Sequence, residues 1–181
     1  VIFGGTGSDS LFGSSGNDIL FGGKGSDILA GDPGHDVYAY NRGDGADRIS
    51  NWPGDVWGER DALSFGGGIL TADVTAFVDV EGRLILNTGA EGDTLILDWF
   101  NPLADYEELP GAAVVFAQFI SGNGSIRVFD LARLVTDRRG ELLAADEDNP
   151  VSLFGDAADY DVTADWIWEG QPLGGSPALA Y

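Results

Sequence analysis

Aspartate recurs at every ninth residue near the start of the chain, at Asp9, Asp18, Asp27 and Asp36. Carboxylates next to turns that present backbone carbonyls form a set of hard oxygen ligands, and this set favours Ca²⁺. Zinc prefers nitrogen or sulfur ligands, and Mg²⁺ fits less well because it needs a compact octahedral shell and retains its waters. The spacing therefore predicts a series of calcium sites.

Glycine, aspartate and leucine hold fixed places in four nine-residue copies. The copies read GGTGSDSLF, GSSGNDILF, GGKGSDILA and GDPGHDVYA over residues 4–39. Turns favour Asp and Gly on local grounds alone, but four copies in register favour a binding role. Glycine at the first, second and fourth places allows positive φ, so the backbone turns tightly and directs its carbonyls inward. The candidate carbonyl ligands are Gly4, Gly5, Gly7, Gly13, Gly16, Gly22, Gly23, Gly25, Gly31 and Gly34.

The last three residues of each copy are apolar and partly β-branched, which predicts a short strand. These expected strands cover residues 10–12, 19–21, 28–30 and 37–39. One side chain of each strand, at the eighth place of the copy, is expected to point inward. These side chains are Leu11, Leu20, Leu29 and Tyr38.

The repeat resembles the Gly-Gly-x-Gly-x-Asp-x-U-x nonapeptide of RTX proteins, bacterial calcium-dependent proteins that are exported by type I secretion. The resemblance implies an all-β, right-handed parallel β-roll in which two nonapeptides make one coil. Turns on the same side then stack in two columns, with Asp9 over Asp27 and Asp18 over Asp36. Together with turn carbonyls, these pairs would hold about three to four Ca²⁺ ions.

Two further aspartates follow the regular copies. After a two-residue insertion, residues 42–49 read RGDGADRI, and Asp47 takes the sixth place in the column of Asp27. A weaker match to the repeat pattern follows at Gly58, Asp61 and Leu63, with one residue too many between the glycine and the aspartate. Asp61 is therefore a candidate ligand for the column of Asp36, reached through a loop.

The chain of 181 residues is strongly acidic, with 30 Asp and Glu against 9 Lys and Arg and a formal net charge of -21. This charge excludes binding to a nucleic-acid backbone, and bound divalent cations would offset the self-repulsion. The absence of cysteine excludes disulfides, thiolate metal sites and a cysteine nucleophile. No apolar run reaches about eighteen residues, so we expect no transmembrane segment. We also expect a monomer.

Beyond residue 50 the pattern changes to ordinary strands separated by turns. The expected strands are 62–65, 74–80, 83–87, 94–100, 114–120 and 125–129, with a short helix at 130–135. The segments DALSFGGGIL, GRLILN, DTLILDWF and FISGNGSIRVFDLARL resemble the region that follows the repeats in many RTX proteins. We expect a β-roll over 1–49, a mainly β capping region over 50–136, and a tail over 137–181.

The resemblance implies a calcium-dependent folding module of a secreted, extracellular bacterial protein. It would stay disordered without Ca²⁺ and fold after export, with the tail engaging the type I secretion machinery. Val1 suggests a fragment of a longer toxin, adhesin or enzyme, but this part is expected to be non-catalytic. One alternative is an adhesive or glycan-binding module that uses Trp52, Trp57, Trp166 or Trp168. The other is a hydrolase with paired carboxylates, although no acid stands out for that role.

Overall fold

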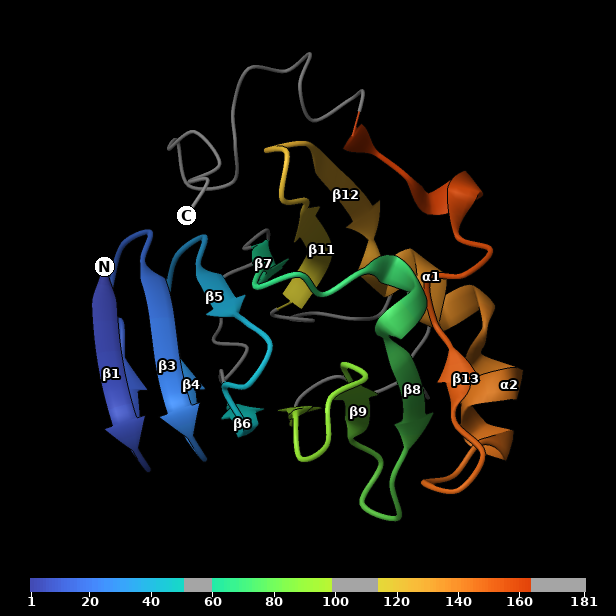
Figure 1. Cartoon of the computed structure of the whole chain (residues 1–181), viewed down its shortest axis with the longest axis horizontal. Helices are drawn as coiled ribbons and strands as arrows, with labels where there is room; N and C mark the ends of the chain where they lie inside the picture. Colours follow the sequence, from blue (N-terminus) through green and yellow to red (C-terminus); the bar gives the residue numbers. More distant parts are fainter. Residues whose placement is uncertain (51–59, 99–113, 164–181) are drawn as a thin grey trace.

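Two mixed β-sheets form the computed structural model, which describes residues 1–50, 60–98 and 114–163 (Figure 1). The first sheet holds, in spatial order, β1 (Ile2–Gly7), β3 (Ile19–Gly25), β5 (Val37–Tyr40), β7 (Asp61–Phe65), β11 (Val114–Ile120) and β12 (Ile126–Asp130). The second sheet holds β2 (Ser10–Phe12), β4 (Ile28–Ala30), β6 (Ala46–Ile49), β10 (Thr94–Leu97), β9 (Leu84–Asn87), β8 (Thr75–Val78) and β13 (Val151–Ser152). The described chain is mainly β, as the sequence predicts.

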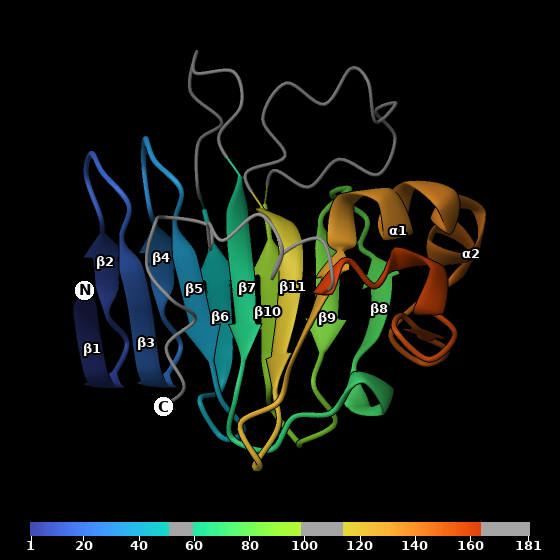
Figure 2. The same ribbon diagram turned by 90° about the horizontal axis from the view of Figure 1, so that it is seen from above.

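The repeat segment alternates between the two sheets, so that odd-numbered strands enter the first sheet and even-numbered strands the second (Figure 2). Successive strands of one sheet are parallel, and equivalent residues two nonapeptides apart are paired, as in Ile2 with Leu20 and Ser10 with Ile28. The four eighth-place side chains are buried between the sheets, as expected. Their exposed fractions are 5% for Leu11, 0% for Leu20, 1% for Leu29 and 1% for Tyr38.

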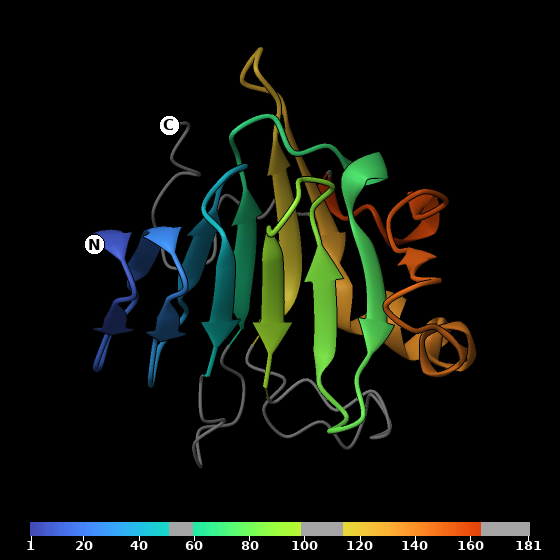
Figure 3. The same ribbon diagram turned by 60° about the horizontal axis from the view of Figure 1, so that its bottom comes forward.

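The later chain continues both sheets from the end of the repeats. Strand β10 pairs in parallel with β6, and β11 pairs in parallel with β7. Each sheet then ends in antiparallel strands, β11 with β12 in the first and β10, β9, β8 and β13 in the second (Figure 3). These strands cover the end of the repeat stack that would otherwise expose unpaired backbone.

The strand predictions for the later chain agree closely with the structure. Strand β11 has the predicted bounds, whereas β8 is shorter than the predicted segment 74–80. The predicted segment 94–100 begins with β10, but its last two residues lie outside the described residues. The predicted helix is α1 (Leu131–Asp137), which begins after Asp130 because the Asp130 carboxylate accepts a hydrogen bond from the Arg133 amide at 2.9 Å.

Part of the expected tail is packed onto the same core. Helix α2 (Arg139–Ala144), β13 and a 3₁₀ turn (Ala158–Tyr160) lie next to α1, far from β1 in Figures 1 and 2. Leu142 and Leu153 are fully buried and Phe154 is 3% exposed, in the cluster that also contains Leu20. A second 3₁₀ turn (Thr71–Asp73) precedes β8.

Several sequence predictions fall on residues outside the described ranges. They concern Trp52, Trp57, Trp166 and Trp168, Gly58 and the tail beyond residue 163. None of the helices described here is long and apolar enough to cross a membrane.

Candidate metal centre

The aspartates of the repeat stack in two columns, and the first contains Asp9, Asp27 and Asp47. The Asp27 carboxylate turns toward the preceding coil, where its Oδ1 accepts a hydrogen bond from the Asp9 amide at 2.8 Å. In the same way, Oδ1 of Asp47 accepts from the Asp27 amide at 3.0 Å. The insertion before Asp47 therefore leaves it in the column that the sequence assigns to it.

The second column contains Asp18, Asp36 and Asp61 and repeats the same contacts. Oδ1 of Asp36 accepts from the Asp18 amide at 2.8 Å, and Oδ1 of Asp61 accepts from the Asp36 amide at 2.8 Å. Asp61 thus reaches its expected column even though 25 residues, rather than 18, separate it from Asp36. Metal ligation by these aspartates stays a prediction, but their columns are those that the resemblance to RTX repeats implies.

In the first column, the second carboxylate oxygen, Oδ2, is the atom suited to bind a cation. Oδ2 of Asp9 and Oδ2 of Asp27 are buried, and neither has a hydrogen-bond partner among the described residues. The Asp27 residue is only 1% exposed. A buried carboxylate oxygen without a donor is costly, and a bound cation would remove that cost. The donor chemistry of this column therefore fits Ca²⁺.

The first-place glycines make room for these carboxylates. A Cβ placed on Gly22 would lie 2.5 Å from Asp27 Oδ2, and one on Gly31 would lie 2.1 Å from Asp36 Oδ2. The same contact is 3.0 Å for Gly4 with Asp9. The expectation of positive φ at the first place is wrong, because only second- and fourth-place glycines of the repeat adopt it. Lack of a side chain, rather than backbone freedom, explains glycine at the first place. The equivalent residue in the remaining copy is Gly13.

Fourth-place glycines allow one coil to approach the next closely. A Cβ on Gly25 would lie 1.7 Å from the Gly7 carbonyl oxygen, and one on Gly34 would lie 1.9 Å from the Gly16 oxygen. The second-place pair, Gly5 with Gly23, shows the same close approach at 2.2 Å. Glycine at these places therefore lets neighbouring coils stack closely, and the role of its carbonyls as additional ligands stays a prediction. Ser14 and Asp32 hold the second place in the other copies and also have positive φ, 69° and 63°.

Negative charge accumulates where the first column meets the later chain. Burial raises the pKa of Asp47 to about 7, and the carboxylates of Asp27, Asp44 and Asp93 add to the increase. Burial also raises the pKa of Asp44. A neighbouring divalent cation would have the opposite effect on these carboxyl groups.

Sequence reasoning did not single out Asp44 or Asp93. The Asp93 carboxylate accepts a hydrogen bond from the Gly43 amide at 2.6 Å, and Asp44 accepts from the Asn41 amide at 2.7 Å. Asp93 is only 4% exposed. The glycine–aspartate pair directly before β10 is the one sequence signal that would have pointed to Asp93.

The second column differs from the first at its last aspartate, Asp61, which contacts the Tyr38 hydroxyl. The hydroxyl accepts a hydrogen bond from the Gly31 amide at 3.0 Å and donates a long one to Asp61 Oδ2 at 3.4 Å. Burial raises the pKa of Tyr38, so the phenol keeps its proton. Asp61 therefore has protein donors at both oxygens, and its proposed role as a metal ligand competes with this contact.

Within the described ranges, no three His, Asp or Glu side chains converge on one point. A cation in either column would therefore depend on backbone carbonyls as well as aspartates. The glycine turns are the predicted source of such carbonyls, and a shell rich in carbonyls suits the roomy oxygen shell of Ca²⁺ better than the compact shell of Mg²⁺.

Residues 3–38 match the family model of the RTX calcium-binding nonapeptide repeat, in 4 copies. The N-terminal segment is therefore a repeat region of the RTX type, which supports calcium binding and the β-rich fold. The match includes the first four aspartates of the two columns and ends before Asp47 and Asp61. A comparison with curated proteins found no match for this chain.

Proposed function

We propose that this chain, with its RTX-type repeat region, is a calcium-dependent folding module. Its repeats form a right-handed parallel β-roll whose two columns hold about three to four Ca²⁺ ions. The later strands cap that roll. Division of the chain at residues 49 and 136 stays a prediction. One hydrophobic core contains residues from all three of these segments, from Leu11 to Ala157.

The buried carboxylate of Asp27 is the observation that carries this proposal. One of its oxygens accepts the Asp9 amide at 2.8 Å, while the other has no hydrogen-bond partner among the described residues. Gly22 leaves space for that second oxygen, since a Cβ there would approach it to 2.5 Å. A calcium ion in the column satisfies the oxygen and neutralises part of the charge.

Calcium then contributes directly to folding. The formal charge of -21 opposes compaction, and the repeats contribute mainly one buried side chain per strand. The unfolded chain has no preformed cage, so the binding free energy appears as stability. Each site contributes about 2.7 kcal/mol when free calcium exceeds its Kd a hundredfold. Without calcium, the repeats are disordered.

Export explains why such dependence is useful. Extracellular modules bind Ca²⁺ with Kd values of about 10⁻⁴ to 10⁻³ M, so the chain stays unfolded at low intracellular calcium and folds outside. RTX repeat proteins are typically secreted by bacteria, which supports an extracellular location for this chain. The tail over 137–181 carries the proposed type I secretion signal, and its residues beyond 163 lie outside the described residues.

The matched family describes a calcium-binding repeat and is not an enzyme family. We therefore assign no catalytic role to this part of the protein. The glycan-binding alternative through Trp52, Trp57, Trp166 or Trp168 concerns residues outside the described ranges.

Ion selectivity tests the proposed function. The chain is stripped with chelator, dialysed and titrated by calorimetry with CaCl₂ and, separately, with MgCl₂. We expect saturable calcium binding at about three to four sites and little magnesium binding, because the carbonyl-rich shell is too large for Mg²⁺. Equal binding of both ions, or no calcium binding up to millimolar concentrations, would contradict the proposal.

A further inference from the structure

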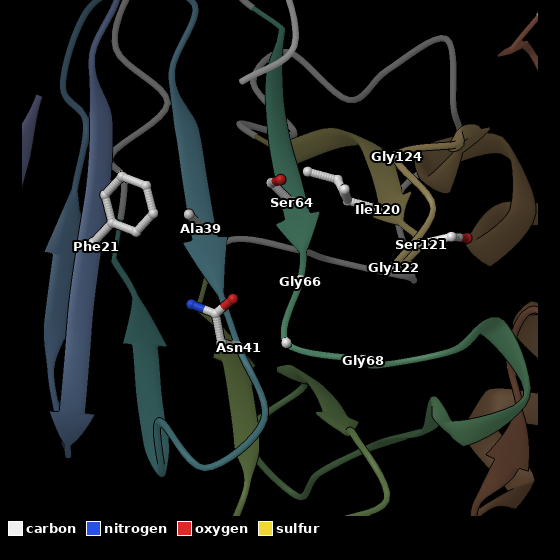
Figure 4. A pocket seen from close by; sticks show the side chains of 11 residues that line it. Phe21, Ala39, Asn41, Ser64, Gly66, Gly68, Ile120, Ser121, Gly122 and Gly124 are labelled. Carbon is white, nitrogen blue, oxygen red and sulfur yellow. The ribbon is translucent and has the colours of Figure 1, made fainter. Parts of the chain in front are cut away.

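The fourth copy of the repeat carries a tyrosine at the eighth place, where the other three copies carry leucine. Tyr38 lies on β5, and Ala39, the next residue along this strand, lines a hollow on the outer face of the first sheet (Figure 4). Because side chains alternate along a strand, Tyr38 points to the opposite side, into the core between the sheets. A phenol hydroxyl in such a position needs hydrogen-bond partners.

Tyr38 finds both of its partners in the second column. Its hydroxyl accepts a hydrogen bond from the Gly31 amide at 3.0 Å and donates one to Asp61 Oδ2 at 3.4 Å. Since the amide already donates to the phenol oxygen, the hydroxyl proton is directed toward the carboxylate. Asp61 Oδ2 therefore has a protein donor, whereas Oδ2 of Asp9 and of Asp27 in the first column has none among the described residues.

The Gly31 amide marks the point at which the regular stacking of the repeat ends. One coil earlier, the equivalent amide of Gly13 donates to the Ala30 carbonyl of the next coil at 2.8 Å. The Gly31 amide donates to the Tyr38 hydroxyl instead. At the same point, the separation of successive aspartates in the second column increases from 18 residues to 25. Tyr38 thus replaces a contact between coils where the repeat spacing is lost.

A calcium ion and a hydroxyl proton compete for the same carboxylate oxygen. The ion needs oxygen ligands at about 2.3–2.6 Å, and a hydrogen directed at Asp61 Oδ2 lies where the ion would have to approach. The phenol cannot simply move aside, because the Gly31 amide and the surrounding core hold it in place. Both Tyr38 and Asp61 are only 1% exposed, so their contact is also shielded from water.

We propose that Tyr38 terminates the second column, because its hydroxyl occupies the Asp61 oxygen that a further calcium ion would need. Asp61 then keeps its place in the column by accepting the Asp36 amide, without binding calcium. This inference rests on the proposed calcium-binding function and makes Tyr38 a positioning residue that limits the number of ions. The second column therefore joins β7 through a neutral hydroxyl instead of a cation.

Tyr38→Phe tests this role in the full chain, since it removes the hydroxyl and retains the ring. Asp61 Oδ2 loses its phenol donor, and calcium can approach it beside Asp36. We expect calorimetric titration of the chelator-stripped variant to give one more bound calcium ion per chain than the unmodified protein. A merely structural role for the hydroxyl would lower stability and leave the number of ions unchanged.

Asp61→Asn is measured with and without the tyrosine substitution. Asparagine retains an oxygen for the Asp36 amide but has no negative charge. In the chain that keeps Tyr38, this change is expected to leave the number of bound ions unchanged, because Asp61 is not a ligand there. Combined with Tyr38→Phe, it is expected to remove the additional ion. The four proteins form a cycle that assigns the new site to Asp61.

Two further tyrosine variants are controls. Tyr40→Phe removes a hydroxyl that is similarly buried but donates to the Gly45 carbonyl, which also accepts the Thr94 amide at 2.9 Å. Tyr160→Phe removes a contact of 3.0 Å with the Asp137 carboxylate, outside both columns. Neither variant is expected to change the number of bound ions. Far-UV circular dichroism at saturating calcium establishes that each variant is folded.

Three outcomes would overturn the proposal. They are an unchanged or smaller number of ions in Tyr38→Phe, the loss of an ion in Asp61→Asn alone, and the gain of an ion in either control. If Tyr38→Phe does not fold, the Asp61→Asn result still decides whether Asp61 is a ligand in the unmodified chain. Failure of the proposed function is distinct, because the unmodified chain would then bind no calcium.

Discussion

Substitution of Gly25 by alanine is expected to destabilise the calcium-bound chain by about 3 kcal/mol or more. The added Cβ would lie 1.7 Å from the Gly7 carbonyl oxygen, and the backbone φ of +145° is unfavourable for alanine. Because the contact is between two backbones, no flexible side chain can move to relieve it. The coil that contains Gly7 must then separate from its neighbour. Urea unfolding at saturating calcium measures the loss.

Gly7→Ala is the matched control for this effect. Gly7 holds the same place in the preceding coil, and its φ of +118° is also positive, but a Cβ there has no atom within 4 Å. The control therefore contains the backbone strain without the collision, and it is expected to cost about 1 kcal/mol. Equal destabilisation by the two substitutions would show that close stacking of the coils does not limit stability.

The Asp27→Asn variant is expected to need about tenfold more calcium to fold. Asparagine retains the shape of the side chain and an oxygen that can accept the Asp9 amide, but it has no negative charge. The loss therefore reports the attraction between the carboxylate and the cation. The measurement is the calcium midpoint of the far-UV circular dichroism signal.

Asp148→Asn provides the same change of charge at an exposed loop position. Its calcium midpoint is expected to stay close to that of the unmodified chain, because screening by solvent makes a distant surface charge count for little. A midpoint for Asp27→Asn that is no higher than that of this control would remove Asp27 from the ligand set.

The repeat spacing predicted the inward side chains, and the resemblance to RTX repeats implied the two columns. Position in the nine-residue period determines the direction of each side chain, and consecutive copies enter opposite sheets, so Asp9 and Asp27, two copies apart, lie in one column. Asp47 follows an insertion and still occupies the first column, since Arg48 and Ile49 pair with β4 in the parallel register. Strand β11 was predictable because its β-branched and apolar residues are bounded by clear turn residues.

The partners of the later strands were not predictable from sequence. Parallel pairing of β6 with β10 and of β7 with β11 joins segments far apart in the chain and leaves no local signal. The packed part of the tail was missed for a related reason. Helix α2 is short and buries only Leu142, so its sequence lacks a strong apolar period, and packing against the core determines its position.

The space that the carboxylates need was also not predictable from the sequence. Glycine at the first place was attributed to backbone freedom, whereas Gly22 is needed because Asp27 Oδ2 lies against it.

A calcium titration of the chelator-stripped chain, followed by far-UV circular dichroism, tests the central claim most directly. The account predicts little β signal in excess chelator and a cooperative gain at millimolar Ca²⁺ that Mg²⁺ does not reproduce. A fully folded spectrum in excess chelator would contradict it, because the paired aspartates would then have stacked without a cation.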